Sequence, residues 1–338
     1  MSIVKSASTV RAVDALRHVL PTSADVQCGA GGEEPDLVVN GCALELRWVG
    51  RGRLGDARQL LQDAPVSERL IAVAREFSPG AKNALTEQGV GWVDETGAAE
   101  IAVGSIVVSR TGRPTKQADP EARWTPSVLA TAEALLCGLP ATVSSIEEVT
   151  GLSTGSCTKA LRTLTQLGLL ASDAERGPTS GRHVTDPTAL LEAYATADRA
   201  RRPAIELVVG VLWRDAVARL AQIGQRWTAG DIGWASTGAV ASAVLAPFLT
   251  TIDAAVVYVD TETIAGLEAT ARVADLVPIE GGRLTLRPFP TVSTRRLSTF
   301  VDGLQVAPWP RVYADLQDIG VRGEEAAEHL REVVGGDR

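Results

Sequence analysis

The chain has 338 residues, with 33 Lys and Arg against 41 Asp and Glu and a formal net charge of −8. This length suggests two or three domains of roughly 100–200 residues each. Apolar residues make up 45% and charged residues 22%, as in ordinary globular chains, so disorder of the whole chain is excluded. The acidic total argues against a protein that coats nucleic acid by bulk charge, but it leaves room for a local basic face.

The sequence contains no run of about 18 uncharged apolar residues that would span a membrane. Residues 1–20 lack the apolar core of a signal peptide and have helical apolar spacing instead. We therefore expect a cytoplasmic protein with no membrane partner. Four cysteines without CxxC spacing and three histidines argue against a disulfide framework, a zinc centre and a His-based triad. No metal and no cofactor is expected.

Residues 1–110 have the pattern of a mixed α/β domain. After the opening helix, two short apolar runs at 36–39 and 42–49 are joined by Asn40-Gly41. Asn-Gly between two such runs predicts a hairpin with a type I′ turn, because both residues tolerate a positive φ. The pattern then predicts further elements in chain order: a helix at 55–62, a strand at 69–74, a helix opened by Ser78-Pro79, and strands at 91–94 and 100–109.

Residues 124–186 have the helix–helix–helix–hairpin order of a winged helix-turn-helix. Residues 111–123 before them are polar, contain two prolines and lack apolar periodicity, which is typical of a linker. The first helix starts at Thr125-Pro126, and a capping box at 144–147 predicts a second, short helix. A third helix covers about 154–167, and two short strands follow around a tip at 173–181.

The third helix has the chemistry of a DNA-reading helix, which needs small polar and basic side chains on one exposed stripe. Arg176 and Arg182 lie in the expected wing, where cations can contact phosphate. The acidic residues of this segment slightly outnumber its basic ones, so we expect modest, salt-sensitive binding of double-stranded DNA, strengthened by a homodimer. The alternative is a winged helix that serves only as a structural or protein-contact module. The predicted DNA-facing residues of the helix are Thr154, Ser156, Thr158, Lys159, Arg162 and Thr163.

Asp36, Glu45 and Arg47 lie on the two runs of the predicted hairpin. Their spacing resembles the Asp…Glu-X-Lys arrangement of the PD-(D/E)XK nuclease fold, in which two carboxylates hold Mg²⁺ and a Lys steadies the attacking water. Asp14 or Asp25 would supply a further upstream acid. Arg47 stands in the position of the Lys, and Arg does not replace Lys in proton transfer. We therefore expect a nuclease-like domain without activity; the alternative is a Mg²⁺-dependent DNA nuclease that uses Asp36 and Glu45.

Residues 187–338 predict a second α/β block, so that the whole chain is of the α/β (α+β) class in three parts. Asp186-Pro187 opens a helix to about residue 200. Nearly continuous apolar runs at 205–212 and 254–260 predict strands that are buried on both faces. Other helices are expected at 214–223, 237–246 and 324–334, and short strands at 276–279, 284–288 and 305–307.

Residues 70–114 contain a series of short motifs: Ser78-Pro79, Gly89, Trp92-Val93-Asp94 and Gly97-Ala98-Ala99. With these motifs the segment resembles the amino-terminal part of the AbiEi antitoxin family of type IV toxin–antitoxin systems. The resemblance continues in the winged segment and in residues 310–316 and 323–328, but Ala98 stands where the family has Asn. It implies a DNA-binding repressor of its own operon and a possible cognate nucleotidyltransferase toxin as partner. An alternative role is neutralisation of a toxin through the carboxy-terminal block, without DNA.

Overall fold

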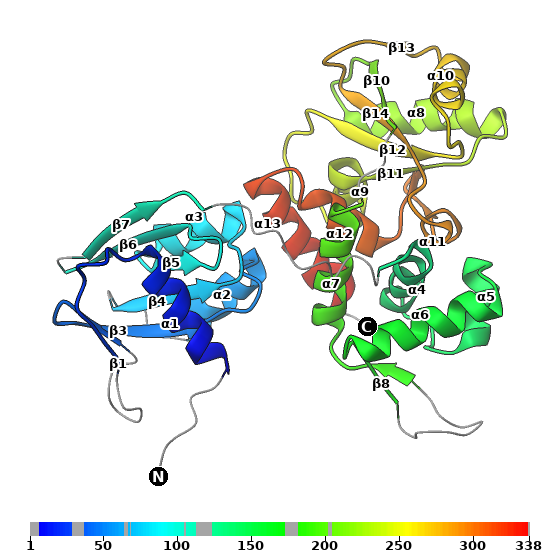
Figure 1. Ribbon diagram of the computed structural model, residues 1–338. Coiled ribbons are helices and arrows are strands. Elements are labelled where there is room, and N and C mark those ends of the chain that lie inside the picture. Colours follow the sequence, from blue (N-terminus) through cyan, green and yellow to red (C-terminus); the bar gives the residue numbers. More distant parts are fainter. Residues whose placement is uncertain are drawn as a thin grey trace. The chain divides into compact units, whose positions relative to one another are not determined.

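The structure is a computed structural model that describes residues 7–28, 37–63, 67, 69–104, 106–112, 124–172, 182–201 and 205–336. The chain forms two compact units, Met1–Ala118 and Asp119–Arg338 (Figure 1). Each unit contains helices and a mixed sheet, which confirms the expected α/β class. Most of the predicted linker, residues 113–123, lies outside the described residues.

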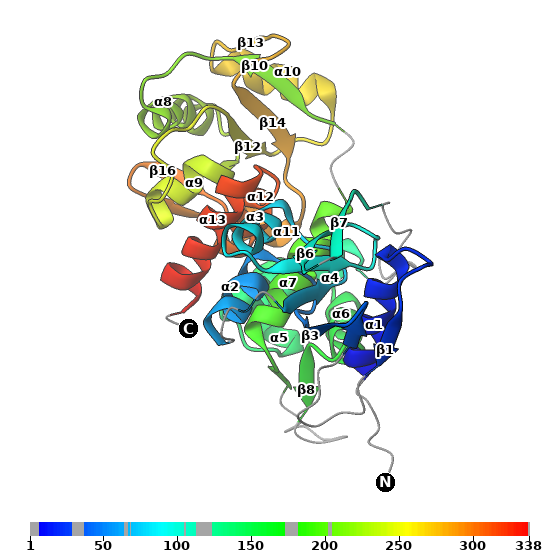
Figure 2. The same cartoon turned by 90° about the vertical axis from the view of Figure 1, so that its left-hand side faces the viewer.

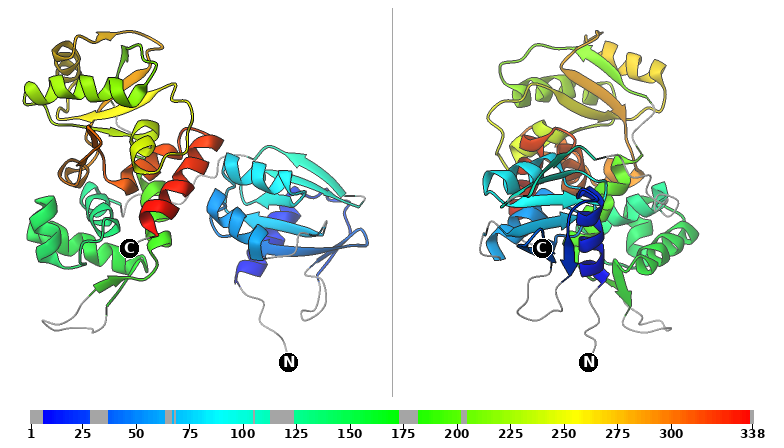
Figure 3. Two further views of the ribbon diagram at one scale, coloured as in Figure 1. Left: turned by 180° about the vertical axis from the view of Figure 1, so that it is seen from behind. Right: turned by 60° about the vertical axis from the view of Figure 1, so that its left-hand side comes forward.

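The first unit is a sheet with helices on both faces (Figures 1 and 3). Its strands lie side by side in chain order; β3, β4 and β5 run parallel, and the other neighbouring pairs are antiparallel. One face packs against α1 and the other against α2 and α3. The elements are α1 (Ala7–Val19), β1 (Val26–Cys28), β2 (Leu37–Val39), β3 (Cys42–Trp48), α2 (Leu54–Asp63), β4 (Leu70–Ala74), α3 (Pro79–Glu87), β5 (Gly91–Asp94), β6 (Ala99–Val103) and β7 (Ile106–Arg110).

The turn between β2 and β3 confirms the Asn-Gly prediction. Asn40 has a φ of 49° and Gly41 a φ of 77°, and the two strands pair in antiparallel register. The predicted single strand at 100–109 is wrong, because β6 and β7 fold back on each other there. Gly104, with a φ of 56°, breaks the apolar run and permits the reversal.

The second unit begins with three helices and a two-stranded hairpin, the order of elements predicted for residues 124–186, which are called the winged helix below. The predicted capping box is wrong in detail: the hydroxyl of Thr142 accepts a hydrogen bond from Ser145 N at 3.2 Å, so the second helix begins two residues earlier. The wing tip at 173–181 lies outside the described residues. The elements are α4 (Pro126–Leu136), α5 (Val143–Thr150), α6 (Thr154–Gln166), β8 (Leu170–Ser172) and β9 (Arg182–Val184).

The carboxy-terminal block is built on a second mixed sheet (Figure 2). The strand order of this sheet is β13-β10-β14-β12-β11-β16-β15. The predicted strand at 254–260 is confirmed as a buried strand. The predicted strand at 205–212 is wrong in extent and burial, since only four of its residues form a strand and Leu212 is 88% exposed. This strand is second from one edge of the sheet, and the edge strand beside it pairs with only two of its residues, Val209 and Gly210. The strands are β10 (Leu207–Gly210), β11 (Trp234–Thr237), β12 (Ala255–Val259), β13 (Val277–Pro278), β14 (Leu284–Pro288), β15 (Thr299–Val301) and β16 (Leu304–Val306).

Helices join this sheet to the winged helix in one continuous hydrophobic core. The core runs from Leu161 of the third helix through Tyr194 to Trp227 and Val257. The winged helix and the carboxy-terminal block therefore belong to one compact unit. The helices of the block are α7 (Pro187–Arg199), α8 (Ala216–Ala229), α9 (Gly238–Leu245), α10 (Ile264–Val273), α11 (Val292–Arg296), α12 (Trp309–Leu316) and α13 (Val321–Leu330), with a π-helical turn, η2 (Arg331–Gly335), after the last.

Candidate nucleic-acid interface

Helix α6 has one buried face and one exposed face. Ser153 caps its start, because its hydroxyl accepts a hydrogen bond from Ser156 N at 3.3 Å. Its buried side chains recur at helical spacing and pack into the core of the unit. This packing fixes which side chains face outward. The buried residues are Cys157, Ala160, Leu161 and Leu164.

The outward face of α6 carries the residues that the sequence predicted. Thr154, Lys159 and Arg162 are exposed, and Ser156, Thr158 and Thr163 are half-buried at its margins. Within the described part of the chain, Lys159 and Arg162 form no ion pair. In the described chain these two cations thus lie without an ion-pair partner among small hydroxyl side chains, and both residue types can contact base edges and phosphates.

Two hydroxyl groups on this face bond back to the helix itself. Thr158 donates to Thr154 O at 2.8 Å, and Thr163 donates to Lys159 O at 3.0 Å. Each hydroxyl proton is therefore used, but the oxygen lone pairs stay available to a donor on a ligand. An adenine or cytosine amino group is such a donor.

The wing contributes one described cation. Arg182 begins β9 opposite Ser172 of β8 and is half-buried. Arg176 belongs to the tip and lies outside the described residues. The structure thus places six predicted residues on one helix and a seventh on the hairpin that follows it.

Glu147, the acidic residue of the predicted capping box, makes a different contact: its carboxylate reaches the start of α6. The hydroxyl of Thr154 donates to both carboxylate oxygens of Glu147, at 3.0 Å each. Burial, followed by the charge of Glu147, raises the pKa of the Cys157 thiol on the same helix. A buried thiol with a raised pKa stays protonated, so Cys157 is a packing residue here rather than a reactive thiolate.

A buried polar cluster joins the winged helix to the carboxy-terminal block. Glu133 on α4 is fully buried, and its Oε2 accepts hydrogen bonds from Tyr194 at 3.0 Å, Thr291 at 3.0 Å and Thr294 at 2.9 Å. Burial raises the pKa of Glu133, against the opposing effect of Arg311 and of the hydroxyl donors. Sequence patterning could not find this cluster, because its members are more than 60 residues from Glu133 along the chain.

Arg311 on α12 is the cation of this cluster and is 1% exposed. It forms an ion pair with Asp198 on α7 and lies over the ring of Tyr194, 5.2 Å from its centroid. Burial acts to lower the pKa of Arg311, but the carboxylate of Asp198 and the neighbouring phenols raise it well above its ordinary value. A permanent positive charge therefore lies at the junction of α4, α7 and α12.

Asp315, one helical turn after Arg311, faces the sheet. Its Oδ2 accepts hydrogen bonds from Thr237 at 2.5 Å and from Tyr258 at 2.7 Å. Burial raises the pKa of Asp315 to about 6, although Arg311 acts in the opposite direction. The same chain of contacts thus reaches from the winged helix to β11 and β12.

The carboxylate site predicted in the first unit is only partly described. Glu45 and Arg47 alternate with buried Leu44 and Leu46 on β3, so both are exposed on the face of the strand away from α1. Asp14 is exposed on α1, which packs against the opposite face of β3, and Asp25 precedes β1. Asp36 lies outside the described residues. Among the residues that the structure describes, no group of three or more His, Cys, Asp or Glu side chains could hold a metal ion.

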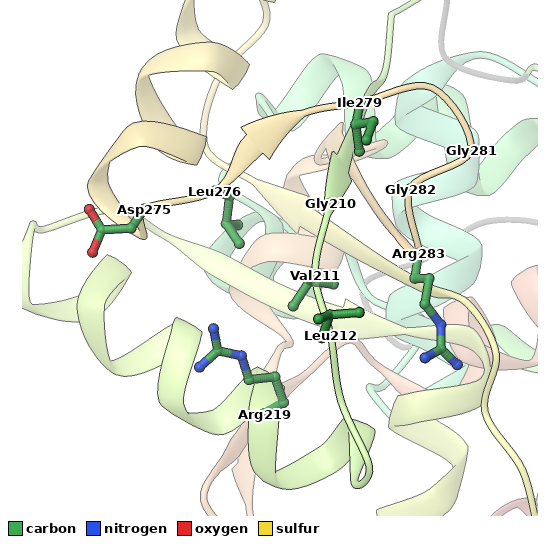
Figure 4. Close-up of a pocket in the computed structure, with 10 residues that line it drawn as sticks. All are labelled: Gly210, Val211, Leu212, Arg219, Asp275, Leu276, Ile279, Gly281, Gly282 and Arg283. Atoms are coloured by element: carbon green, nitrogen blue, oxygen red, sulfur yellow. The ribbon is translucent and has the colours of Figure 1, made fainter.

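An open hollow of about 480 Å³ lies at the edge of the second sheet, between β10, the end of α10 and the loop before β14 (Figure 4). Leu212, Leu276 and Ile279 give it an apolar wall, and Arg219 and Arg283 lie at its margins. Arg283 is already engaged, by stacking on Trp213 and by a hydrogen bond to Asp253 O at 2.8 Å.

The chain was compared with family models, with curated proteins and with solved structures, and no match to it was found. In the described part of the chain, no helix combines the length and apolar character needed to cross a membrane.

Proposed function

We propose that the protein binds double-stranded DNA through α6 and regulates transcription. The observation that carries this proposal is the outward face of α6, where Lys159 and Arg162 stand without carboxylate partners in the described chain among Thr154, Ser156, Thr158 and Thr163. A helix of this kind enters the major groove, and its cations contact guanine edges or phosphates.

The order of the elements around α6 supports the same proposal. α4 and α5 precede it and the β8–β9 hairpin follows, so Arg182 lies on the hairpin that comes directly after the helix that would enter the groove. The hydroxyl groups on the helix keep free lone pairs for donors on the bases. Together these features provide both base contacts and backbone contacts.

The role as a repressor and antitoxin rests on the resemblance to the AbiEi family. In this proposal a homodimer binds two half-sites about one helical turn apart, which offsets the modest affinity of one winged helix. A cognate nucleotidyltransferase toxin would be the second partner. A role in toxin neutralisation without DNA is the competing proposal, and it predicts no selective DNA binding.

The experiment is a fluorescence anisotropy titration of the full chain with the DNA upstream of its own coding region. Random DNA of equal length is the control, and both titrations are repeated over a salt series. We expect selective binding whose affinity falls linearly with the logarithm of the salt concentration. Equal and weak affinity for both DNAs would contradict the proposal.

A DNA nuclease is a second candidate, favoured by the exposure of Glu45 and Arg47 on one face of β3. The presence of Arg47 instead of Lys weighs against it. Incubation of the same DNA with Mg²⁺, followed on a gel, tests this candidate. Cleavage that is lost in Glu45→Gln would support the nuclease, and intact DNA would exclude it for that substrate.

A further inference from the structure

The turn between α5 and α6 is covered by a side chain from the carboxy-terminal block. Gly151 ends α5 with a φ of 69°, and a Cβ placed on it would lie 2.4 Å from Arg296 Nη1 and 2.7 Å from Nη2. The guanidinium of Arg296 therefore lies directly against the backbone of this turn. Any side chain at position 151 would displace it.

Buried hydrogen bonds fix the position of α11, the short helix that carries Arg296. Ser293 donates to Ala130 O at 2.9 Å, and Thr294 donates to Glu133 Oε2 at 2.9 Å. α11 packs against α4 and α5, as Figure 1 also shows. Arg296 is thus held at the helix-turn-helix by contacts that do not involve its own side chain.

The two neighbouring arginines of α11 differ in their charge partners. Arg295 pairs with Asp260, with 2.7 Å between Nη2 and Oδ2. Arg296 is exposed and has no ion pair within the described residues. Its charge is therefore available to a ligand that approaches the turn before α6.

We propose that Arg296 is a phosphate-contacting residue of the DNA interface, contributed from outside the winged helix. This inference rests on the proposed function of α6. When a helix-turn-helix docks, the start of the recognition helix enters the major groove, and the preceding turn lies near the sugar–phosphate backbone. Gly151 is three residues before Thr154, the first residue of α6. A guanidinium at that position can bind a phosphate through two parallel hydrogen bonds.

The charges near this turn explain why a cation there would strengthen the binding of DNA. Glu147 and Glu148 lie on α5, and Glu147 is bonded to Thr154 at the start of α6. These carboxylates repel phosphate near the start of α6, which is the end of that helix expected to come closest to DNA. A cation beside the turn offsets that repulsion, and the winged segment itself has none before Lys159.

The test compares the full-length wild type with Arg296→Gln, Arg296→Lys and Arg272→Gln in the anisotropy salt series. Arg272 is the matched control, because it is exposed at the end of α10, forms no ion pair within the described residues, and belongs to the same unit. Circular dichroism and a thermal melt confirm that each variant is folded.

We expect Arg296→Gln to bind the selected DNA about fivefold to tenfold more weakly and to lower the slope of log affinity against log salt by about one. Arg296→Lys keeps most of the slope, and Arg272→Gln behaves as the wild type. If the wild type binds the DNA selectively but Arg296→Gln has the same affinity and the same slope, this inference is overturned while the proposed function stands. A weaker affinity with an unchanged slope would also overturn it, since that result indicates a buttress of the turn. Absence of selective binding by the wild type would overturn the proposed function and this inference with it.

Discussion

Arg311 Nη2 on α12 lies 3.8 Å from Glu133 Oε2 on α4, and both side chains are almost completely buried. The first helix of the winged helix is thereby tied to a helix near the carboxyl end of the chain. Asp198 on α7 pairs with the same guanidinium. The winged helix and the carboxy-terminal block are thus joined by a buried polar cluster as well as by a shared apolar core.

Removal of the buried cation should destabilise the second unit strongly. Arg311→Ala leaves the buried carboxylate of Glu133 and the partly buried carboxylate of Asp198 without their cation; such a loss typically costs about 3–5 kcal/mol in the free energy of unfolding. Urea denaturation followed by tryptophan fluorescence measures the loss. Arg295→Ala is the matched control, because its ion pair with Asp260 is exposed and is worth about 1 kcal/mol or less. Equal losses in the two variants would contradict this account of the cluster.

The raised pKa of Asp315 predicts a pH dependence of stability with a definite sign. Its pKa is about 6 in the folded protein and 3.8 in the unfolded chain, so the folded state binds more protons between these values. Stability from this group is therefore greatest below pH 4 and falls as the pH rises to 6, by up to about 3 kcal/mol. The free energies of unfolding of the wild type and Asp315→Asn, measured by urea denaturation from pH 4 to 7, should differ by an amount that changes over this window. A difference that stays constant with pH would refute the assignment.

The substitution Gly155→Ala on α6 should weaken DNA binding without lowering the stability of the fold. It is exposed on the outward face, and a Cβ added there meets no atom within 4 Å. Ala favours the helix over Gly by roughly 0.5–1 kcal/mol, so Gly155→Ala should be as stable as the wild type or slightly more so. The added methyl group would instead meet DNA that approaches the helix closely. We expect weaker binding in the anisotropy titration without a loss in melting temperature. Unchanged affinity would show that DNA does not approach the helix at this position.

The thiol of Cys157 should be protected in the folded protein. It is fully buried on α6, and burial raises its pKa. With a chromogenic thiol reagent, Cys157→Ser and the wild type should therefore react alike under native conditions. In denaturant the wild type should gain one additional reactive thiol relative to the variant. Rapid native reaction of one extra thiol in the wild type would contradict this prediction.

Local sequence signals predicted local structure well. Asn40-Gly41 indicated the turn that its backbone angles confirm, and the helix predicted to open at Ser78-Pro79 begins there, where the Ser78 hydroxyl accepts a hydrogen bond from Ala81 N. The wrong predictions lie where a nearby residue has a stronger local effect than the residues on which the prediction rested. Thr142 caps α5 ahead of Ser144, and Gly104 turns one predicted strand into a hairpin.

Sequence patterns did not predict the contacts between residues that lie far apart along the chain. Arg311 appeared in the sequence as one residue of a degenerate motif, and its burial against Glu133 depends on packing between segments far apart along the chain. Arg296 resembles any exposed helix-end arginine until the fold places it on Gly151. Periodicity identifies which face of α6 is buried, but it does not indicate what the rest of the chain brings beside that face.

The most direct test of the central claim is the affinity of Lys159→Gln/Arg162→Gln for the upstream DNA, measured by fluorescence anisotropy. Arg272→Gln/Arg322→Gln is the matched control, because it removes the same charge from exposed residues of the same unit outside the winged helix. We predict that the α6 variant binds at least about tenfold more weakly and loses selectivity over random DNA, whereas the control keeps wild-type affinity. Wild-type affinity and selectivity in the α6 variant, or an equal loss in both variants, would contradict recognition of DNA by α6.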